Sequence, residues 1–422
     1  VGEVMSIGRT FKESFQKALR SLETDRAGLG SDGFLTELLE FEDLRKQGTL
    51  MQTLERDLRT GSPDRIFRVK QALSEGMSVE EVYELSRIDR WFLYQFADLI
   101  AVEKAYQPGC LQDDERLLEF KRAGYSDRQL AFLEHRDLLM QKLRTATDLY
   151  AFRKEALDLL RSTEKEIRSR RYSSGILPVY KKVDTCGGEF EAHTPYLYST
   201  YEEEDESDVQ PGQKVMILGG GPNRIGQGIE FDYCCCHAAF ALKEMGIASL
   251  MVNSNPETVS TDYDTSDKLY FEPLTVEDVL HICEKEKPAG IIVQFGGQTP
   301  LKLAHALEEA GFPIIGTSTD SIDRAEDRDR FAAMLKRLNL AQPRNGIART
   351  AEEALAVART IGFPCLVRPS YVLGGRAMAI VHDDDSLMDF MRKAADINPE
   401  HPVLIDQFLE NAIEIDVDAL CD

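Results

Sequence analysis

A glycine-rich turn is the first place in this sequence where residue type and spacing point to chemistry. Residues 219–221 are consecutive glycines that directly follow the apolar run 214–218. The dinucleotide-binding fingerprint fails because Arg224 stands where its third glycine should be, and the phosphate-binding loop of NTPases fails because Gln227 replaces its lysine. What remains is a backbone turn that opens a helix, which is a candidate anion site.

Two further loops carry polar residues directly after apolar strands. The loop 253–262 is rich in Asn, Ser, Thr and Asp, and the loop 294–300 combines glycines with the amides of Gln294 and Gln298. Loops at the carboxyl ends of parallel strands meet at one edge of the sheet, where open α/β sheets bind ligands. We therefore expect the three loops to converge, although three well-capped surface turns would give the same pattern.

The elements that must position these loops alternate between strand and helix from residue 213 onward. Apolar runs bounded by turn residues predict strands at 214–218, 249–253, 290–294 and 313–316. Helical patterns between them include 276–286 and 302–310. This alternation predicts a parallel, Rossmann-like sheet.

Residues 1–170 form one helical pattern after another. Apolar residues recur at steps of three and four over 85–106, which predicts one continuous helical stripe. The similar segments 76–78 and 124–126 each contain a Gly that ends one helix and a Ser that caps the next. The lone Trp91 is interpreted as a core residue, and nothing in the region is arranged for chemistry. A helical module of this kind packs, spaces or oligomerises.

The stretch 171–210 shows no regular pattern. It contains five tyrosines and ends in the acidic run 202–208. An acidic run is typical of a solvated linker, and the aromatic residues before it favour a strap laid over a domain surface. We therefore interpret 171–210 as a linker or strap.

Composition excludes several classes of function. The 422 residues carry 50 Lys and Arg against 73 Asp and Glu, a net charge of −23, which argues against a broad grip on nucleic acid. No apolar run reaches the ~18 residues of a membrane span.

The eight cysteines form no C-x-x-C pair, and we interpret the run 234–236 beside His237 as buried thiols and not as metal ligands. These features predict a cytoplasmic protein.

Four segments together resemble the large subunit of carbamoyl-phosphate synthase. They are the glycine-rich block 219–233, the polar block 255–267, the short run 298–301 and the block 368–378, which contains Arg and Gly. This family is built from two homologous synthetase halves separated by a helical oligomerisation domain. It makes carbamoyl phosphate from bicarbonate, glutamine-derived ammonia and two ATP. The resemblance implies that this chain is a middle piece of such a subunit.

The resemblance implies a multidomain α and α/β fold with four parts. We expect an all-helical oligomerisation domain at 1–170, the linker or strap at 171–210, a Rossmann-like pre-ATP-grasp domain at 211–323, and a truncated N-terminal lobe of an ATP-grasp fold at 324–422. The last two parts would open the C-terminal half, which phosphorylates carbamate with ATP.

The resemblance also implies an ATP site. Its residues would be Arg328, Arg368, Gly374, Gly375, Gln407, Leu409 and Glu414. Arg368 would neutralise charge during phosphoryl transfer and is the implied catalytic residue, while the two glycines would let backbone close over the phosphates. Adenine would lie against 407–409, through main-chain atoms if the side chain of Gln407 takes no part, and the ribose near Glu414. From the residue pattern alone, a surface ion pair is favoured for Arg328 and a plain alternating strand for 414–418.

Several implied components lie outside this chain. Mg or Mn would act with ATP through ligands expected beyond Asp422, so no metal ligand is assigned within the chain, and the chain alone is expected to be inactive. A small glutaminase subunit would supply ammonia, and the helical domain would mediate self-association. The setting implied is a cytoplasmic ligase of pyrimidine and arginine biosynthesis. Two alternatives stay open: a scaffold or oligomerisation module without catalysis, and a biotin-carboxylase-like ATP-grasp enzyme.

Overall fold

The structure, a computed structural model, describes most of the chain. The described residues are 3–146, 149–192, 194–224, 228–348, 350–369, 378–397, 403–413, 415 and 417. They form two compact units, of which the first runs to Thr319 without 224–227 and the second comprises 224–227 and the chain from Asp320 onward. Among the described residues, no helix is both long and apolar enough to cross a membrane.

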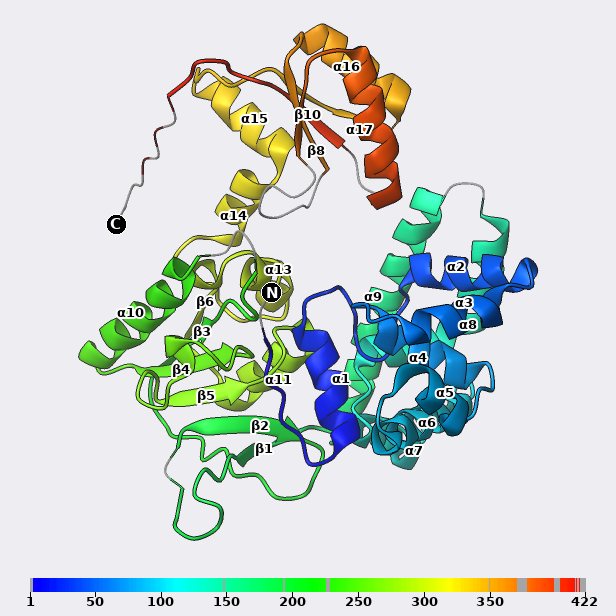
Figure 1. The fold of residues 1–422 in the computed structure, drawn as a ribbon. Coiled ribbons are helices and arrows are strands. Elements are labelled where there is room, and N and C mark those ends of the chain that lie inside the picture. Colours follow the sequence, from blue (N-terminus) through cyan, green and yellow to red (C-terminus); the bar gives the residue numbers. More distant parts are fainter. Residues whose placement is uncertain are drawn as a thin grey trace. The chain divides into compact units, whose positions relative to one another are not determined.

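The first unit begins with a helical domain, α1 to α9 (Figure 1). Its elements are α1 (Phe11–Ser21), α2 (Leu35–Lys46), α3 (Leu50–Arg59), α4 (Arg65–Ser74), α5 (Val79–Ser86), α6 (Arg90–Lys104), the 3-10 turn η1 (Cys110–Gln112), α7 (Asp114–Arg122), α8 (Asp127–Thr145) and α9 (Leu149–Ser173). The repeated Gly–Ser signal is confirmed. Ser78 and Ser126 each begin a helix with a reciprocal capping box, and Gly76 and Gly124 have positive φ.

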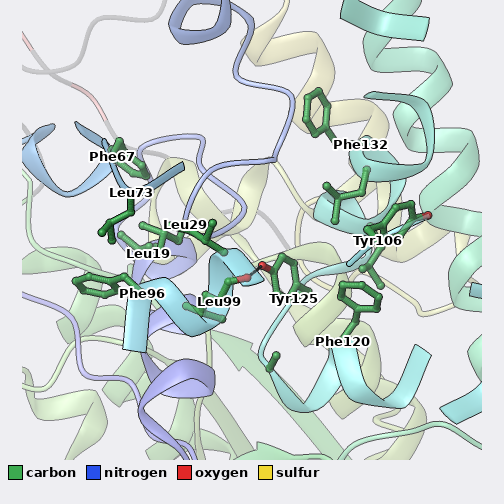
Figure 2. Close-up of a cluster of buried hydrophobic side chains, with 14 of the residues drawn as sticks. Leu19, Leu29, Phe67, Leu73, Phe96, Leu99, Tyr106, Phe120, Tyr125 and Phe132 are labelled. Atoms are coloured by element: carbon green, nitrogen blue, oxygen red, sulfur yellow. Dashed lines mark hydrogen bonds between the residues drawn. The ribbon is translucent and has the colours of Figure 1, made fainter. Parts of the chain in front are cut away.

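The core of the helical domain is a contiguous apolar cluster (Figure 2). Side chains from α1, α4, α6, α7 and α8 meet there, among them Leu19, Phe67, Phe96, Phe120 and Phe132. Both tyrosine hydroxyls in this view have partners: that of Tyr125 donates to the Leu99 carbonyl at 2.9 Å, and that of Tyr106 donates to the Glu134 carboxylate. The amphipathic pattern of 1–170 therefore does build a core of its own.

The prediction of one continuous helical stripe over 85–106 is wrong in one respect, because the segment contains two helices. α5 ends at Ser86, Arg87 adopts left-handed backbone with φ 60°, and the Asp89 side chain caps the new helix α6. The apolar period persists across the break because both helices face the same core. Periodicity alone therefore could not reveal the break.

Trp91 is not the core residue that the pattern favoured. Its side chain is 53% exposed, near the start of α6. The indole meets the ring of Phe11 edge-on, with centroids 5.2 Å apart. Position 91 lies beside the buried face of α6. A large aromatic side chain is usually buried, but here its position on the helix leaves it half-exposed.

The described strands of the first unit form a six-stranded sheet. They are β1 (Val179–Lys182), β2 (Tyr196–Thr200), β3 (Lys214–Leu218), β4 (Ala248–Asn253), β5 (Lys268–Phe271) and β6 (Gly290–Ile292). Their order is β1-β2-β5-β4-β3-β6, with β1 antiparallel to β2 and all other neighbours parallel. The predicted Rossmann-like parallel sheet is therefore present.

Two expectations about this sheet need correction. The strand predicted at 313–316 contributes only an isolated bridge between Ile314 and Ile291. The stretch 171–210, expected to be irregular, supplies β1 and β2. β1 reads Val-Tyr-Lys-Lys and so lacks a run of apolar residues; it is held by ladder hydrogen bonds to β2 at the sheet edge.

Helices cover both faces of the sheet. The remaining elements of the first unit are α10 (Glu230–Glu244), η2 (Val259–Thr261), α11 (Val276–Glu286), η3 (Gln294–Gly296), α12 (Gln298–Leu301) and α13 (Ala304–Glu309). Val215 and Ile217 of β3 pack in one cluster with Cys235 of α10, whereas Met216 points the other way and its sulfur lies 3.7 Å from that of Cys283 on α11. All of β3 is buried, as expected for a strand covered on both faces.

The second unit contains an antiparallel sheet covered on one face. Its elements are α14 (Thr319–Glu326), α15 (Arg328–Arg337), β7 (Asn345–Ala348), α16 (Ala351–Ile361), β8 (Cys365–Pro369), β9 (Ala379–Val381), α17 (Asp384–Ile397) and β10 (Val403–Gln407). The strand order is β7-β10-β8-β9. Residues of α16 and α17 form one core with Val367 of β8 and Ile405 of β10.

Candidate nucleotide-binding site

The three polar loops of the first unit do converge at the carboxyl edge of the parallel sheet. The Gly221 N–H donates to the side-chain oxygen of Asn253 at 3.1 Å, and the Asn255 amide donates to that of Asn223 at 3.2 Å. A Cβ on Gly296, in the third loop, would lie 2.5 Å from the Gly219 carbonyl oxygen. The loops are therefore packed on one another, and much of their polarity is used within the cluster.

The glycine-rich turn is also contacted by a carboxylate from the helical domain. Glu23, which follows α1, accepts a hydrogen bond from the hydroxyl of the buried Thr299. A Cβ on Gly221, whose φ is +67°, would lie 2.4 Å from Oε1 of Glu23. The turn predicted as an anion site thus has a carboxylate of the chain itself against it. Nothing in the local pattern around Glu23 could have indicated this contact.

The cysteine run lies on α10 and faces the sheet. Cys235 and Cys236 are buried and Cys234 is half-buried, and all three are thiols without a disulfide. Burial, with the nearby Asp232, raises the pKa of Cys236 to about 12, so its thiol is protonated at neutral pH. In the part of the chain that the structure describes, no three His, Cys, Asp or Glu side chains are grouped to hold a metal ion.

In the second unit, strand alternation turns Arg368 away from the helices. Cys365 and Val367 of β8 are fully buried under α16 and α17, so Arg368 lies on the opposite face, where its side chain is 39% exposed. Asp406 shares that face from β10, and its Oδ2 lies 3.3 Å from Nε of Arg368. Arg368 pairs in register with Leu404, which makes the contact with Asp406 a diagonal one across neighbouring strands.

Apolar side chains flank this ion pair on the same face. Ile347 on β7 is opposite Leu404, and Ile380 on β9 is opposite Leu366. Ile347 and Ile380 are 45% and 43% exposed, which is high for branched apolar side chains within strands. Exposed apolar side chains beside a half-exposed guanidinium suit a ligand with an aromatic part and an anionic part.

The end of β10 is held by Arg344, a residue that the sequence analysis missed. The Gln407 N–H donates to the Arg344 carbonyl at 2.8 Å, and the Arg344 Nε lies 3.3 Å from the side-chain oxygen of Gln407. The next N–H, of Phe408, donates to the Pro364 carbonyl at 3.1 Å. Two of the main-chain donors expected near adenine are therefore used within the chain, whereas Leu409 is 53% exposed.

The remaining predicted site residues are not placed. Gly374, Gly375 and Glu414 lie outside the described residues. Arg328 is the first residue of α15, but its side chain is likewise outside the described part. Arg368 and Gln407 lie on adjacent strands, but Arg368 is opposite Leu404 whereas Gln407 is opposite Cys365, so strand alternation places the two side chains three pairs apart and on different faces of the sheet. Leu409 follows just beyond β10.

Three family models match consecutive stretches of the chain. The first is described as carbamoyl-phosphate synthetase large chain, oligomerisation domain, and matches residues 3–157. The second is the carbamoyl phosphate synthase preATP-grasp domain, at 211–324. The third is the carbamoyl-phosphate synthase L chain, ATP binding domain, at 327–422.

Curated relatives are similar along the whole of this chain. The carbamoyl phosphate synthase large chains of Nostoc sp. and Pseudomonas aeruginosa are 55% and 54% identical to it, and the arginine-specific, chloroplastic large chain of Arabidopsis thaliana is 51% identical. Each match covers 100% of this chain but only 37%, 36% and 34% of the respective relative. The chain therefore spans little more than a third of the length of these relatives.

Among solved structures, the biotin carboxylase domain of Hydrogenobacter thermophilus 2-oxoglutarate carboxylase is similar to part of the chain. It is 23% identical, and the match covers 47% of this chain and 45% of that one. The TM-score is 0.38.

Proposed function

Because the chain belongs to the family of carbamoyl phosphate synthase large chains, we propose that it helps to form the site where ATP phosphorylates carbamate. The observation that carries this proposal is the half-exposed Arg368 on the open face of the second sheet, within the stretch matched by the ATP-binding domain model. The biotin-carboxylase-like alternative is disfavoured, because the oligomerisation-domain model matches 3–157.

We infer the four-part division predicted from the sequence. The helical oligomerisation domain would occupy 1–170, a linker or strap 171–210, the pre-ATP-grasp domain 211–323 and a partial ATP-grasp domain 324–422. Family matches at 3–157, 211–324 and 327–422 support these boundaries. The strands β1 and β2 would make the linker part of the pre-ATP-grasp sheet.

In the proposed reaction, a carbamate oxygen attacks the γ-phosphorus of ATP as the bond to the ADP oxygen breaks. Arg368 would face the phosphates and stabilise the negative charge that is spread over the transferring group. Asp406 would fix the direction of that guanidinium, leaving its terminal nitrogens for phosphate oxygens. Both residues project from strands of one sheet, which holds them in position.

The nucleotide would lie along the open face. Its base would lie near Gln407 and Leu409 at the end of β10, beside one of the exposed apolar side chains Ile347 and Ile380, which stand on the two edge strands β7 and β9. Gly374 and Gly375 would close over the phosphates, Arg328 would add a second cation and Glu414 would accept from the ribose hydroxyls. These roles for Arg328, Gly374, Gly375 and Glu414 rest on the family resemblance.

A divalent cation, Mg or Mn, would neutralise phosphate charge when bound with ATP. Among the described residues, no group of carboxylates fits such an ion. We infer that its ligands belong to the rest of the subunit. Residues 1–422 alone should then show no ATP formation from ADP and carbamoyl phosphate, and magnesium-dependent turnover by this chain would contradict the inference.

The assembly proposed includes further partners. A small glutaminase subunit would deliver ammonia, and the helical domain would mediate self-association, with the exposed Trp91 and Tyr94 of α6 as candidate contact residues. We infer a role in pyrimidine and arginine biosynthesis and a cytoplasmic setting, with the chloroplast relative as a known exception.

The proposal is tested by Arg368→Ala in the full-length subunit with its partner. ATP formation from ADP and carbamoyl phosphate should fall on the order of 100-fold, or about 3 kcal/mol, while bicarbonate-dependent ATP hydrolysis changes much less. The matched control is Arg359→Ala on α16, whose side chain is 65% exposed and paired with Asp384. Equal loss of both activities, or an unchanged ATP-forming rate, would contradict the assignment.

A further inference from the structure

The start of α11 lies beside the helical domain (Figure 1), and the boundary between them is lined by charged side chains withdrawn from water. We define the charged joint as eight of these side chains, four cations and four carboxylates, that are linked by ion pairs and at most 16% exposed. They are Lys17 and Arg20 of α1, Lys121 of α7, Arg171 of α9, Asp127 of α8, Glu272 after β5, and Glu277 and Asp278 of α11. Glu277 has 16% of its side chain exposed and the other seven have 8% or less.

One half of the charged joint is a cluster around Asp127 and Glu277. Nζ of Lys121 lies 3.1 Å from Asp127 and 2.6 Å from Glu277, while Nε of Arg171 lies 2.9 Å from Asp127. The second oxygen of Glu277 accepts the backbone N–H of Asp127 at 2.7 Å, at the first residue of α8. Each carboxylate is thus bound by more than one donor, and Glu277 reaches into the helical domain from the opposite side.

The other half consists of two pairs made by α1. Nζ of Lys17 lies 3.0 Å from Oε1 of Glu272 and donates to the Ser199 carbonyl at 2.6 Å. Nε of Arg20 lies 3.4 Å from Oδ2 of Asp278, and its Nη1 donates to the Gly124 carbonyl at 2.9 Å. Both cations therefore pair with a carboxylate on the sheet side of the joint, and each also donates to a backbone carbonyl.

Charge is divided unevenly between the two sides of the joint. All four cations and one carboxylate belong to the helical domain, whereas the other three carboxylates belong to β5–α11 and its loop. Within these eight side chains the charges balance when the two sides are in contact, and separation would leave each side with an excess of three like charges. The buried Glu13 of α1, beside Lys17 and Arg20, adds one further carboxylate on the helical side. Although burial alone would raise the pKa of Glu277, Lys121 and Arg171 lower it to about 2, so it is ionised at neutral pH.

We propose that the basic face of the helical domain is a docking surface specific for the acidic start of α11, which joins helical domain and parallel sheet into one cooperatively unfolding unit. Buried charges are tolerated only when matched, so a partner for this face must offer three carboxylates in the positions of Glu272, Glu277 and Asp278. An apolar or basic surface would leave Lys121 and Arg171 short of a counter-charge. The helical domain is accordingly not a module that can be detached without cost.

Urea unfolding of the 1–422 chain tests this with one probe in each part. Fluorescence of Trp91, the only tryptophan, reports on the helical domain. Mass-spectrometric labelling of the fully buried Cys235 on α10 reports on the sheet. The unaltered chain should give the same midpoint with both probes. Two clearly separated midpoints would overturn the proposal without any variant being needed.

The variant Glu277→Gln keeps the shape of the side chain and removes one counter-charge. We expect the Trp91 midpoint to fall by roughly 1 M urea and to separate from the Cys235 midpoint. Glu309→Gln is the matched control, because Glu309 also pairs across the same two parts, with Lys165 at 3.5 Å, but both side chains are more than half exposed. If Glu277→Gln behaves like Glu309→Gln, the joint does not bind the two parts together. Should Glu277→Gln fail to fold, the coincidence of midpoints in the unaltered chain still decides the question.

Discussion

Two arginines of this chain are each paired with an aspartate, and the pairs differ mainly in burial. Arg171 has a fully buried side chain, lies 2.9 Å from Asp127 through Nε and is enclosed by the charged joint. Arg368 has 39% of its side chain exposed and meets Asp406 through Nε at 3.3 Å on an open sheet face. The Arg–Asp pair thus occurs once at a site closed to ligands, around Arg171, and once on a surface open to ligands, around Arg368.

Burial decides what each pair can do. A buried pair has lost its hydration, so its energy depends on having every partner in place, and it contributes to specificity of packing. A partly exposed pair contributes little to stability, because water competes for both groups. It can therefore exchange part of its hydrogen bonding for a ligand phosphate at low cost. The buried pair is structural, and the exposed pair is suited to binding.

The largest expected effect is on stability and concerns the buried pair. Arg171→Met leaves Asp127 and Glu277 with one cation fewer, so the free energy of unfolding should fall by about 3–5 kcal/mol. Arg368→Met should change it by less than about 1 kcal/mol. Urea titrations of the 1–422 chain measure both. Comparable losses for the two variants would break the distinction drawn from burial.

A smaller effect is expected from acid and concerns His281 on α11. Burial, together with the adjacent Arg171 at 3.0 Å, lowers the pKa of His281 well below its ordinary value. The unfolded chain then takes up a proton below pH ~6.5 that the folded chain does not, so stability is present above that pH and is lost as the pH falls. The loss should approach about 1.4 kcal/mol per pH unit.

The control for this pH dependence is His281→Asn. The variant lacks the titrating ring, so its stability should vary less steeply between pH 6.5 and 5.5, measured as urea midpoints at each pH. An unchanged slope would assign the acid sensitivity to groups other than His281.

The smallest expected effect tests whether Asp406 positions Arg368. In the full-length subunit, Asp406→Asn keeps the shape of the side chain but removes the charge beside the guanidinium. ATP formation should fall roughly tenfold, about 1.4 kcal/mol, mainly in kcat, because an unrestrained Arg368 still binds but is misdirected during transfer. A rise in KM with kcat unchanged would instead make Asp406 a binding group.

The sequence allowed local structure to be predicted well where neighbouring residues determine it. The capping boxes at Ser78 and Ser126 and the strand 214–218 depend on residues within a few positions, and all were found as expected. The outward direction of Arg368 follows from strand alternation in the same way. Glu414 and the two glycines of the site lie outside the described residues, so their roles stay predictions.

What the sequence did not reveal depends on residues far apart in the chain. Lys17 and Glu272 form a buried pair, yet neither stands in a pattern that marks it as anything other than a surface charge. The partner of Gln407, Arg344, and the contact of Glu23 with the glycine-rich turn arise in the same way from tertiary packing. Such pairs become visible only when the fold has placed their strands and helices.

The most direct test of this account measures activity and stability on the same full-length preparations. Arg368→Ala should lose ATP formation from ADP and carbamoyl phosphate on the order of 100-fold with an unchanged unfolding midpoint. Arg171→Met should lower the urea midpoint of unfolding, while the rate of ATP formation per folded molecule changes little. If Arg368→Ala lowers stability in step with activity, or leaves ATP formation intact, the open face of the second sheet is not the phosphoryl-transfer site.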